Sequence, residues 1–395
     1  MSAPVGGSRP LLNRRLASFG TTIFAEMSAL ATRTGSINLG QGFPDTDGPT
    51  EIAEAAVRAI RDGRGNQYPP GPGVPELRLA VAAHQERFYG LRYDPDTEVL
   101  VTAGATEAIA AALLALLEPG DEVIALEPFY DSYAACIAMA GATRVPVTLR
   151  PRDGSFGLDL DELRAAVTGR TRLLLLNTPH NPTGTVLGPA ELAAVAELAV
   201  ERDLLVVTDE VYEHLVFEGS HVPLASLPGM RERTVTISSA GKTFSFTGWK
   251  VGWITATPAL VAAVRSAKQF LTYVSSGPFQ YAVAEALALP DTYYEQFRAD
   301  LRARRDLLAD GLERAGLTVH RPQGTYFITT DIAPLGERDG LAFCRALPER
   351  CGVVAIPNAV FYDDKEAGRT QVRWAFCKRT VVLQEAVERL GRLAR

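Results

Sequence analysis

The sequence contains little cysteine, and its cysteines are not placed as a disulfide framework or a zinc module would require. Only four occur among 395 residues. None forms a CxxC pair, and none is spaced from a histidine as zinc ligands are. A disulfide scaffold and a zinc module are both disfavoured, and we predict no metal. The cysteines are Cys136, Cys344, Cys351 and Cys377.

An excess of positive charge is also absent. The 40 lysines and arginines are outnumbered by 46 aspartates and glutamates, which gives a net charge of −6. Sequence-independent binding to nucleic acid needs a basic surface that neutralises phosphates. We therefore predict no nucleic-acid partner.

The chain lacks a long apolar run as well. The longest, Ala108–Leu117, lies between Glu107 and Glu118 and is too short to span a bilayer. The first fifteen residues are small, polar and basic without an apolar core, which is typical of a frayed terminus rather than a signal peptide. We expect a soluble, cytoplasmic protein with no membrane partner.

Lysine is scarce too, and this scarcity makes each lysine informative. Arginine supplies 35 of the 40 basic residues, so only five lysines remain. Two of them, Lys242 and Lys250, fall within one nine-residue window. That window becomes a candidate for chemistry.

What the chain does contain is the balance of an ordinary globular protein, with 47% hydrophobic and 22% charged residues. From about residue 98 to 257, short apolar runs alternate with alanine-rich helical stretches such as Glu107–Leu117, Asp159–Val167 and Ala190–Glu201. Alternating strands and helices predict an α/β fold with a mostly parallel sheet covered by helices. The predicted strands are Val99–Thr102, Val123–Leu126, Arg144–Val147, Leu173–Leu176, Leu204–Thr208, Val235–Ile237 and Val251–Ala256.

The pattern changes after about residue 290. A charged helical stretch, Tyr293–Ala315, precedes short strands near Leu317–His320 and Thr325–Thr330, and a last helix runs near Val381–Leu393. These features predict a smaller α+β unit. We divide the chain into an N-terminal segment, 1–45, that packs with this unit, a large domain, 46–289, and a C-terminal small domain, 290–395.

Polar segments follow four of the predicted strands directly. Open α/β sheets bind ligands at the carboxyl ends of their strands, so four such segments indicate one site. The segments are AGATEA (103–108), NTPHNPTG (177–184), DEVYEH (209–214) and SSAGKTFSFTGWKVGW (238–253).

Each candidate residue also has an ordinary structural alternative. Lys242 could be a surface charge, or it could form a Schiff base with a carbonyl compound. Asp209 could cap a helix, or it could be a buried carboxylate that faces a cationic heterocycle. Asn181 could be no more than a turn residue before a proline.

Three further features remain open in the same way. Gly104, Ala105 and Thr106 open a helix, and its free N–H groups could hold a phosphate, although every helix has such an end. Arg373 could form a structural ion pair, or its guanidinium could grip a carboxylate with two parallel hydrogen bonds. The turn-rich segment 66–78 could be a plain surface loop.

Taken together, these groups match the handling of pyridoxal phosphate (PLP): a Schiff-base lysine, a carboxylate for the ring nitrogen, a phosphate cradle and a carboxylate clamp. The chain resembles the class I/II, fold-type I PLP-dependent aminotransferases, and most closely the branch of kynurenine, glutamine, methionine and N-succinyldiaminopimelate aminotransferases. The motifs that carry the resemblance are NLGQGFPD (38–45), NQYPPGPG (66–73), GATEAI (104–109), EPFYDSY (127–133), NTPHNPTG, TDEVYEHL (208–215), SSAGKTFSFTGWKVGW, GTYF (324–327) and RWAFCK (373–378).

The resemblance implies a large domain with a seven-stranded, mostly parallel sheet and a smaller α+β domain. It also implies three catalytic residues. Lys242 would carry PLP covalently and then act as the general base, with a lowered pKa. Asp209 would pair with the protonated ring nitrogen, and Tyr212 would hydrogen-bond the 3′ oxygen of the cofactor.

The remaining roles follow from the same resemblance. Tyr130 would stack on the cofactor ring, and Asn181 would share the 3′ oxygen with Tyr212. The phosphate would be held by Ala105, Thr106, Ser239 and Lys250, and by Tyr68 from a second subunit. The substrate would be bound by Arg373, Asn181, Gly42 and Phe24, and by Tyr273 and Val274 from the partner chain, which implies a homodimer with shared sites.

The implied activity is ping-pong transfer of an amino group between an L-amino acid and a 2-oxo acid. No second arginine stands at a signature position of the side-chain pocket, which argues against strict aspartate specificity. N-Succinyldiaminopimelate with glutamate, kynurenine, glutamine and methionine remain candidate donors. A PLP-dependent lyase or cyclase on the same scaffold, such as a cysteine-conjugate β-lyase, is the alternative enzyme, and a non-catalytic PLP-sensing module is the third possibility.

Overall fold

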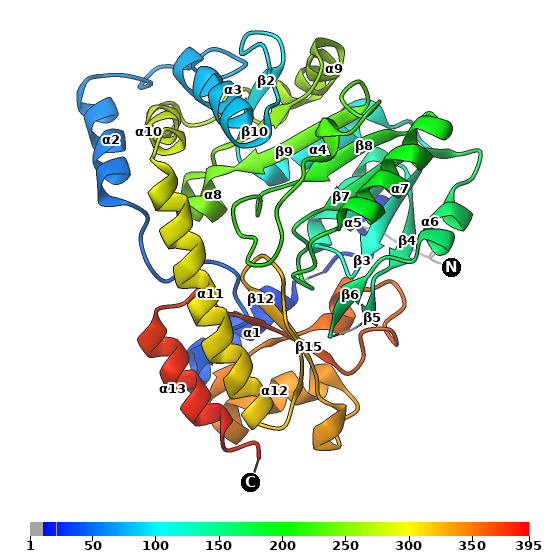
Figure 1. Ribbon diagram of the computed structural model, residues 1–395, viewed down its shortest axis with the longest axis vertical. Helices are drawn as coiled ribbons and strands as arrows, with labels where there is room; N and C mark the ends of the chain where they lie inside the picture. The colour runs from blue at the N-terminus through cyan, green and yellow to red at the C-terminus, as the bar shows by residue number, and fades with distance from the viewer. Residues whose placement is uncertain (1–10, 21, 153, 395) are drawn as a thin grey trace, which may run out of the picture.

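The computed structural model describes residues 11–20, 22–152 and 154–394. At its centre is a seven-stranded sheet with the strand order β2-β10-β9-β8-β7-β3-β4 (Figure 1). All seven predicted strands are confirmed, each to within two residues at either end. They are β2 (Val99–Thr102), β3 (Glu122–Glu127), β4 (Thr143–Thr148), β7 (Thr171–Asn177), β8 (Leu205–Asp209), β9 (Thr234–Ser239) and β10 (Gly252–Thr255).

The sheet is mixed because one strand runs against the others. Strands β9, β8, β7, β3 and β4 pair in parallel, whereas β10 is antiparallel to both of its neighbours, β2 and β9. Both faces are covered, since Leu173 and Leu175 pack into one apolar core while Leu174 and Leu176 pack into another. This two-sided burial explains why the strands are nearly all apolar.

Helices cover the two faces of this sheet. Helix α4 packs against both α5 and α9, and in a second group α10 packs against both α2 and α3. Their bounds are α2 (Thr50–Arg61), α3 (Pro75–Tyr89), α4 (Ala105–Leu116), α5 (Asp131–Ala140), α6 (Leu160–Ala166), α7 (Pro189–Glu201), α8 (Ala240–Thr243), α9 (Pro258–Lys268) and α10 (Gly277–Leu287). A short hairpin of β5 (Arg150–Arg152) and β6 (Ser155–Gly157) lies beside β4 in the chain.

The C-terminal part is built around a four-stranded antiparallel sheet with the order β11-β12-β15-β14. The strands are β11 (Thr318–His320), β12 (Phe327–Asp331), β14 (Ile356–Pro357) and β15 (Gln371–Ala375). The long helix α11 (Asp291–Arg314) runs from the large sheet to this smaller one (Figure 1). Helices α12 (Gly340–Cys351) and α13 (Thr380–Leu390) complete the unit.

The N-terminal segment contacts this C-terminal unit. Helix α1 (Ile23–Thr34) contributes Met27 and Ala31 to the same apolar core as α11 and α13, and β1 (Ile37–Asn38) pairs in parallel with β13 (Val353–Val354). The division at residues 45 and 289 stays a prediction. The expected frayed terminus, 1–15, falls largely outside the described residues.

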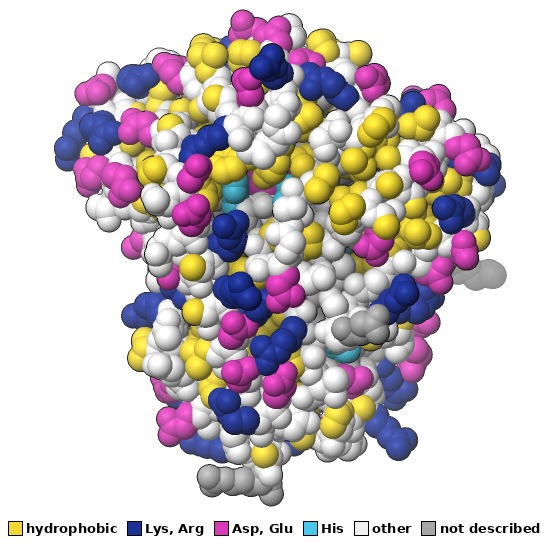
Figure 2. Space-filling view, viewed as in Figure 1, with side chains coloured by type: hydrophobic (Ala, Val, Ile, Leu, Met, Phe, Trp, Pro, Cys, Tyr) yellow, Lys and Arg dark blue, Asp and Glu magenta, His cyan; other side chains and the backbone are white. Residues whose placement is uncertain are grey.

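The charges on the surface and the lengths of the helices are relevant to binding of nucleic acid or a membrane. Basic and acidic side chains are interspersed over the face shown in Figure 2, with no single-sign area on it. None of the described helices combines the length and the apolar character needed to cross a membrane.

Candidate active site

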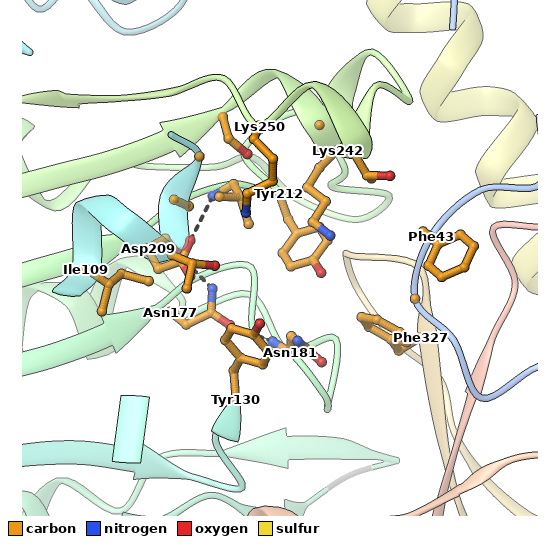
Figure 3. Close-up of a pocket in the computed structure, with 18 of the residues that line it drawn as sticks. Phe43, Ile109, Tyr130, Asn177, Asn181, Asp209, Tyr212, Lys242, Lys250 and Phe327 are labelled. Carbon is orange, nitrogen blue, oxygen red and sulfur yellow. Dashed lines mark hydrogen bonds between the residues drawn. The ribbon is translucent and has the colours of Figure 1, made fainter. Parts of the chain in front are cut away.

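A cavity of about 330 Å³ lies at the carboxyl ends of the parallel strands. Twelve of the fifteen site residues expected from the sequence line it, and Figure 3 shows Lys242 and Lys250 entering from one side and Tyr130 and Asn181 from the other. The twelve are Phe24, Gly42, Ala105, Thr106, Tyr130, Asn181, Asp209, Tyr212, Ser239, Lys242, Lys250 and Arg373. The polar segments after separate strands therefore do converge on one site.

Lys242 lies in α8, the short helix that follows β9. Its side chain points into the cavity, with Nζ 5.8 Å from the centre of the Tyr212 ring and 5.6 Å from that of Tyr326. Burial lowers the pKa of the Lys242 amine, and nearby Cys377 and Asp209 oppose this effect. A buried amine of this kind is neutral more often than the amine of a surface lysine. The neutral form is the one that a nucleophile or general base needs.

Asp209 is the last residue of β8 and is buried. Turn residues follow it, so the alternative that it caps a helix is wrong. Its Oδ2 accepts a hydrogen bond from the Tyr133 hydroxyl at 2.6 Å, and its Oδ1 accepts one from the Val211 N–H at 3.3 Å. Burial raises the pKa of the Asp209 carboxyl, and both hydrogen bonds partly offset that rise. Its hydrogen-bond partners are neutral, so the carboxylate suits a cationic group in the cavity.

The start of α4 and the residues near it form an anion cradle. The N-cap residue Gly104 gives no side-chain cap, so the first N–H groups of the helix, including those of Ala105 and Thr106, are free to bind an anion. A Cβ at Gly104 would lie 3.0 Å from Nζ of Lys250, which shows how closely this lysine approaches the cradle. A helix N-terminus beside an ammonium group suits a phosphate.

Arg373 in β15 is a buried cation that faces the same cavity. Its Nη1 donates to Oδ1 of Asn181 at 3.1 Å, and its Nη2 donates to the Gly40 carbonyl at 2.9 Å. Its Nε has no partner, and no carboxylate within the described ranges forms an ion pair with it. Burial lowers its pKa to about 10, so it remains charged at neutral pH. The alternative of a structural ion pair is therefore wrong.

Aromatic rings form the walls around these polar groups. The Arg373 guanidinium lies 5.1 Å from the centre of the Phe24 ring and 4.1 Å from that of Phe327. A Cβ at Gly42 would lie 2.3 Å from the Phe327 ring, so only glycine fits there. The carbonyl of Gly42 accepts a hydrogen bond from the Tyr326 hydroxyl at 2.6 Å. The pocket is thus shaped for a flat or apolar group beside the Arg373 guanidinium.

Two residues of the site were missed by the sequence analysis, which did not assign them roles. Tyr133 binds Asp209, as described above. Asn177 donates through Nδ2 to the Asp209 carbonyl at 2.8 Å and accepts through Oδ1 from the Asn181 N–H at 2.7 Å. Both lie inside quoted motifs, EPFYDSY and NTPHNPTG, and that position was the available signal.

Three expected site residues do not line this cavity: Tyr68, Tyr273 and Val274. Tyr68 is 81% exposed and Tyr273 is 56% exposed. Their rings contact each other edge to face, with centroids 5.3 Å apart. The two segments, far apart in the sequence, therefore form one aromatic projection on the surface.

One group of the described residues has the composition and spacing of metal ligands: His84, Glu213 and His214. The two imidazoles hydrogen-bond each other through their Nε2 atoms at 2.7 Å, and Glu213 accepts from the Ser238 hydroxyl at 2.5 Å. Burial lowers the pKa of His84 to about 3, which keeps its ring neutral. The facing ligand atoms already bond to protein partners, so the geometry is that of a closed polar cluster.

Comparisons with known proteins agree with this geometry. The family described as aminotransferase class I and II matches residues 34–390. A probable N-succinyldiaminopimelate aminotransferase of Mycobacterium tuberculosis is 57% identical, over 96% of this chain and 98% of that protein. A methionine aminotransferase of Escherichia coli is 41% identical, over 98% and 100%. The solved structure of the N-succinyldiaminopimelate aminotransferase from M. tuberculosis superposes with a TM-score of 0.95, covering 97% of this chain and 100% of that one.

Proposed function

Because the chain belongs to the class I and II aminotransferase family, and is therefore a PLP-dependent enzyme of amino acids and 2-oxo acids, we propose that it transfers amino groups by a ping-pong mechanism, with N-succinyldiaminopimelate and glutamate as the two amino donors and their corresponding oxo acids as the acceptors. The observation that carries a transaminase site is the buried, unpaired Arg373, which faces the same cavity as Lys242 and Asp209. The choice of substrate is supported by the 57% identity to the mycobacterial relative, whose name contains this substrate.

The residues of the cavity fit PLP. When bound, this cofactor supplies an aldehyde for covalent attachment and a cationic ring that withdraws electrons from the substrate Cα. Lys242 would provide the attachment point, and Asp209 would hold the ring nitrogen in its protonated form. Ala105, Thr106, Ser239 and Lys250 would hold the phosphate. The buried carboxylate without a cationic hydrogen-bond partner and the uncapped helix start are the two features that match these groups.

The other side chains orient the reactants. Tyr212 and Asn181 would hydrogen-bond the cofactor's 3′ oxygen, and Tyr130 would cover the ring face. Arg373 would bind the α-carboxylate of the substrate, since its free Nε and its cationic state suit bidentate contact. Phe24 and Gly42 would border the same end of the pocket.

Lys242 would then act as the general base. Its neutral amine would take the proton from the substrate Cα and, within the same half reaction, pass it to C4′ of the cofactor; the second half reaction would run the two transfers in reverse. Arg373 fixes the carboxylate on that Cα, so the C–H bond is presented to the amine in a constant geometry. Tyr133 favours the ionised form of Asp209 by donating a hydrogen bond to its Oδ2.

We propose a homodimer in which each subunit completes the site of the other. Tyr68, Tyr273 and Val274 lie outside the cavity of their own chain, and the two tyrosines form an exposed aromatic pair. Large exposed aromatic side chains that cluster favour an interface over solvent. In the dimer, Tyr68 would reach the partner's phosphate, and Tyr273 and Val274 would border the partner's substrate pocket.

The test is a single half reaction. The PLP-loaded protein is mixed with one amino acid and no 2-oxo acid, and the visible absorption and the product are followed. Ping-pong transfer predicts one equivalent of oxo acid for each subunit and bleaching of the absorption. N-Succinyldiaminopimelate should give the highest kcat/KM, with kynurenine, methionine and glutamine as comparison donors.

Two outcomes would overturn parts of this proposal. A higher kcat/KM for kynurenine, methionine or glutamine would reject the substrate while leaving the transaminase. Continuous release of pyruvate and ammonia from a cysteine conjugate, without bleaching, would instead favour the β-elimination alternative.

A further inference from the structure

Glu107 lies in the first turn of α4, directly beside the residues of the phosphate cradle, and it is buried. Its Oε2 accepts a hydrogen bond from the N–H of Ala103 at 2.5 Å. Its Oε1 accepts one from the hydroxyl of Thr272, 165 residues further along the chain. One carboxylate therefore holds both the loop that leads into the cradle and the segment that carries Tyr273.

The segment 272–274 is fixed at a second point by Lys268, the last residue of α9. Lys268 is 1% exposed, and its Nζ donates to the Tyr273 carbonyl at 2.7 Å. Burial lowers the pKa of Lys268, and the nearby charge of Glu107 opposes that effect. Glu107 thus interacts with the segment in two ways: it accepts a hydrogen bond from Thr272, and its charge acts on Lys268, which holds the segment.

The backbone of this segment is strained. Tyr273 has φ = 66°, a left-handed conformation that is uncommon for residues other than glycine. The Val274 N–H closes a tight turn onto the Thr272 carbonyl at 2.8 Å. Such strain persists only where neighbouring contacts enforce it. The contacts that enforce it here are those from Glu107 and Lys268.

The residues just before the strained turn present apolar side chains to the outside. Phe270 is 84% exposed, Leu271 is 44% exposed, and Tyr68 contacts Tyr273 from the neighbouring loop. That loop packs nearby, since Gly65 lies so close to Gly277 that a Cβ on Gly65 would be 2.6 Å from the carbonyl carbon of Gly277. Turn and loop form one exposed arm, which under the dimer proposed above would contact a second copy of the chain.

We infer that Glu107 is a positioning residue for two active sites at once. Through Ala103 it holds the cradle of its own subunit, and through Thr272 it holds the arm that completes the substrate pocket of the partner. This inference rests on the proposed function, because the arm reaches a pocket only in the dimer. It assigns to one carboxylate a link between the cofactor end of one site and the substrate end of the other.

The experiment separates the two links with variants. Thr272→Val removes only the hydroxyl that binds Glu107, and Thr272→Ser restores it. Glu107→Leu removes both acceptor atoms. Thr97→Val is the matched control, because Thr97 is another exposed threonine whose hydroxyl donates to a carboxylate, that of Asp94 at 2.9 Å.

Each variant is placed in a mixed dimer in which one chain carries Lys242→Ala, so that only one site works. With Thr272→Val on the Lys242→Ala chain, the arm that enters the working site is altered. The substrate KM should then rise about tenfold, as expected for the loss of one hydrogen bond to a charged group, while the cofactor affinity of the working site stays unchanged. With Thr272→Val on the working chain, KM should stay unchanged.

Glu107→Leu should likewise change cofactor affinity or substrate KM, depending on which chain carries it. On the working chain it should lower cofactor affinity, measured by equilibrium dialysis, and leave KM unchanged; on the other chain it should raise KM alone. In the homodimer without cofactor, Thr272→Val should increase amide hydrogen exchange in residues 269–275, whereas Thr97→Val should not, and Thr272→Ser should restore protection.

The opposite results would overturn the inference. If KM rises only when Thr272→Val is on the working chain, or rises in neither arrangement, Glu107 does not act across the interface. A monomer in sedimentation velocity would overturn the proposed dimer and this inference with it. A stable, active dimer with an unmoved KM would reject the inference alone.

Discussion

At the scale of single residues, the sequence predicts the groups that contact ligand better than the groups that hold them. Lys242, Asp209 and Arg373 are unusual in type or setting, and the structure brings all three to one cavity. Tyr133 and Asn177 are ordinary polar residues until the fold places them against Asp209. Nothing in their local sequence shows which carboxylate they will bind, because that contact joins segments far apart in the chain.

Lys242→Ala should abolish covalent attachment of the cofactor and reduce kcat by at least about 10²–10⁴-fold, the usual contribution of a general base. Borohydride reduction followed by peptide mapping checks the attachment site. The wild-type protein should be labelled at Lys242, and the variant should take no label. Label found on Lys250 in the wild-type protein would show that the two lysines have been assigned the wrong way round.

Tyr133→Phe should shift the pH dependence of cofactor binding. The lost hydrogen bond stabilised the ionised form of Asp209, so its removal raises the pKa of that carboxyl further above the ordinary value. As the pH falls, Asp209 should therefore become protonated at a higher pH in the variant than in the wild-type protein. Cofactor affinity should be lost at that higher pH as well. Equilibrium dialysis across a pH series measures this. Coincident curves would mean that Tyr133 does not control the charge of Asp209.

At the scale of elements, what the sequence reveals depends on burial and length. The seven strands of the large sheet are predictable because both of their faces are buried, so each reads as an apolar run. The reversed direction of β10 is not predictable, since an apolar run reads the same in either direction. Two-residue strands such as β1 and β13 are too short to show any alternation, and long-range pairing alone defines them.

The contact between β10 and the start of α4 gives a prediction at this scale. A Cβ on Gly252 would lie 2.7 Å from the carbonyl carbon of Gly104 and 2.9 Å from the nitrogen of Ala105. Gly252→Ala should therefore push the helix start away from the sheet, cost about 1–3 kcal/mol of stability through overpacking and weaken cofactor binding. Thermal unfolding and equilibrium dialysis measure the two effects.

Gly248→Ala is the matched control for that experiment. It lies in the same segment, and nothing lies within 4 Å of a Cβ built on it. It should leave both stability and cofactor affinity near their wild-type values. Equal losses from the two substitutions would show that the cradle does not depend on the close approach at Gly252.

At the scale of the whole molecule, the sequence does not reveal which residues of one chain serve the site of another. The exposed pair of Tyr68 and Tyr273 lies outside its own cavity, and only the resemblance to a family assigned these residues to a partner. Local pattern cannot do so, because an exposed tyrosine at an interface and one in solvent have the same neighbours in sequence. The dimer is therefore best tested by letting two chains share one site.

Complementation between two damaged chains provides that test. Lys242→Ala and Tyr68→Ala should each give a homodimer of low activity, because every site lacks either its base or its partner-derived tyrosine. In a mixed dimer one site combines Lys242 from one chain with Tyr68 from the other, and the second site lacks both. Random exchange in a two-fold dimer should therefore restore about a quarter of the wild-type sites. Activity that stays at the level of the separate variants, after mass spectrometry has shown subunit exchange, would place Tyr68 in the site of its own chain and reject the shared-site dimer.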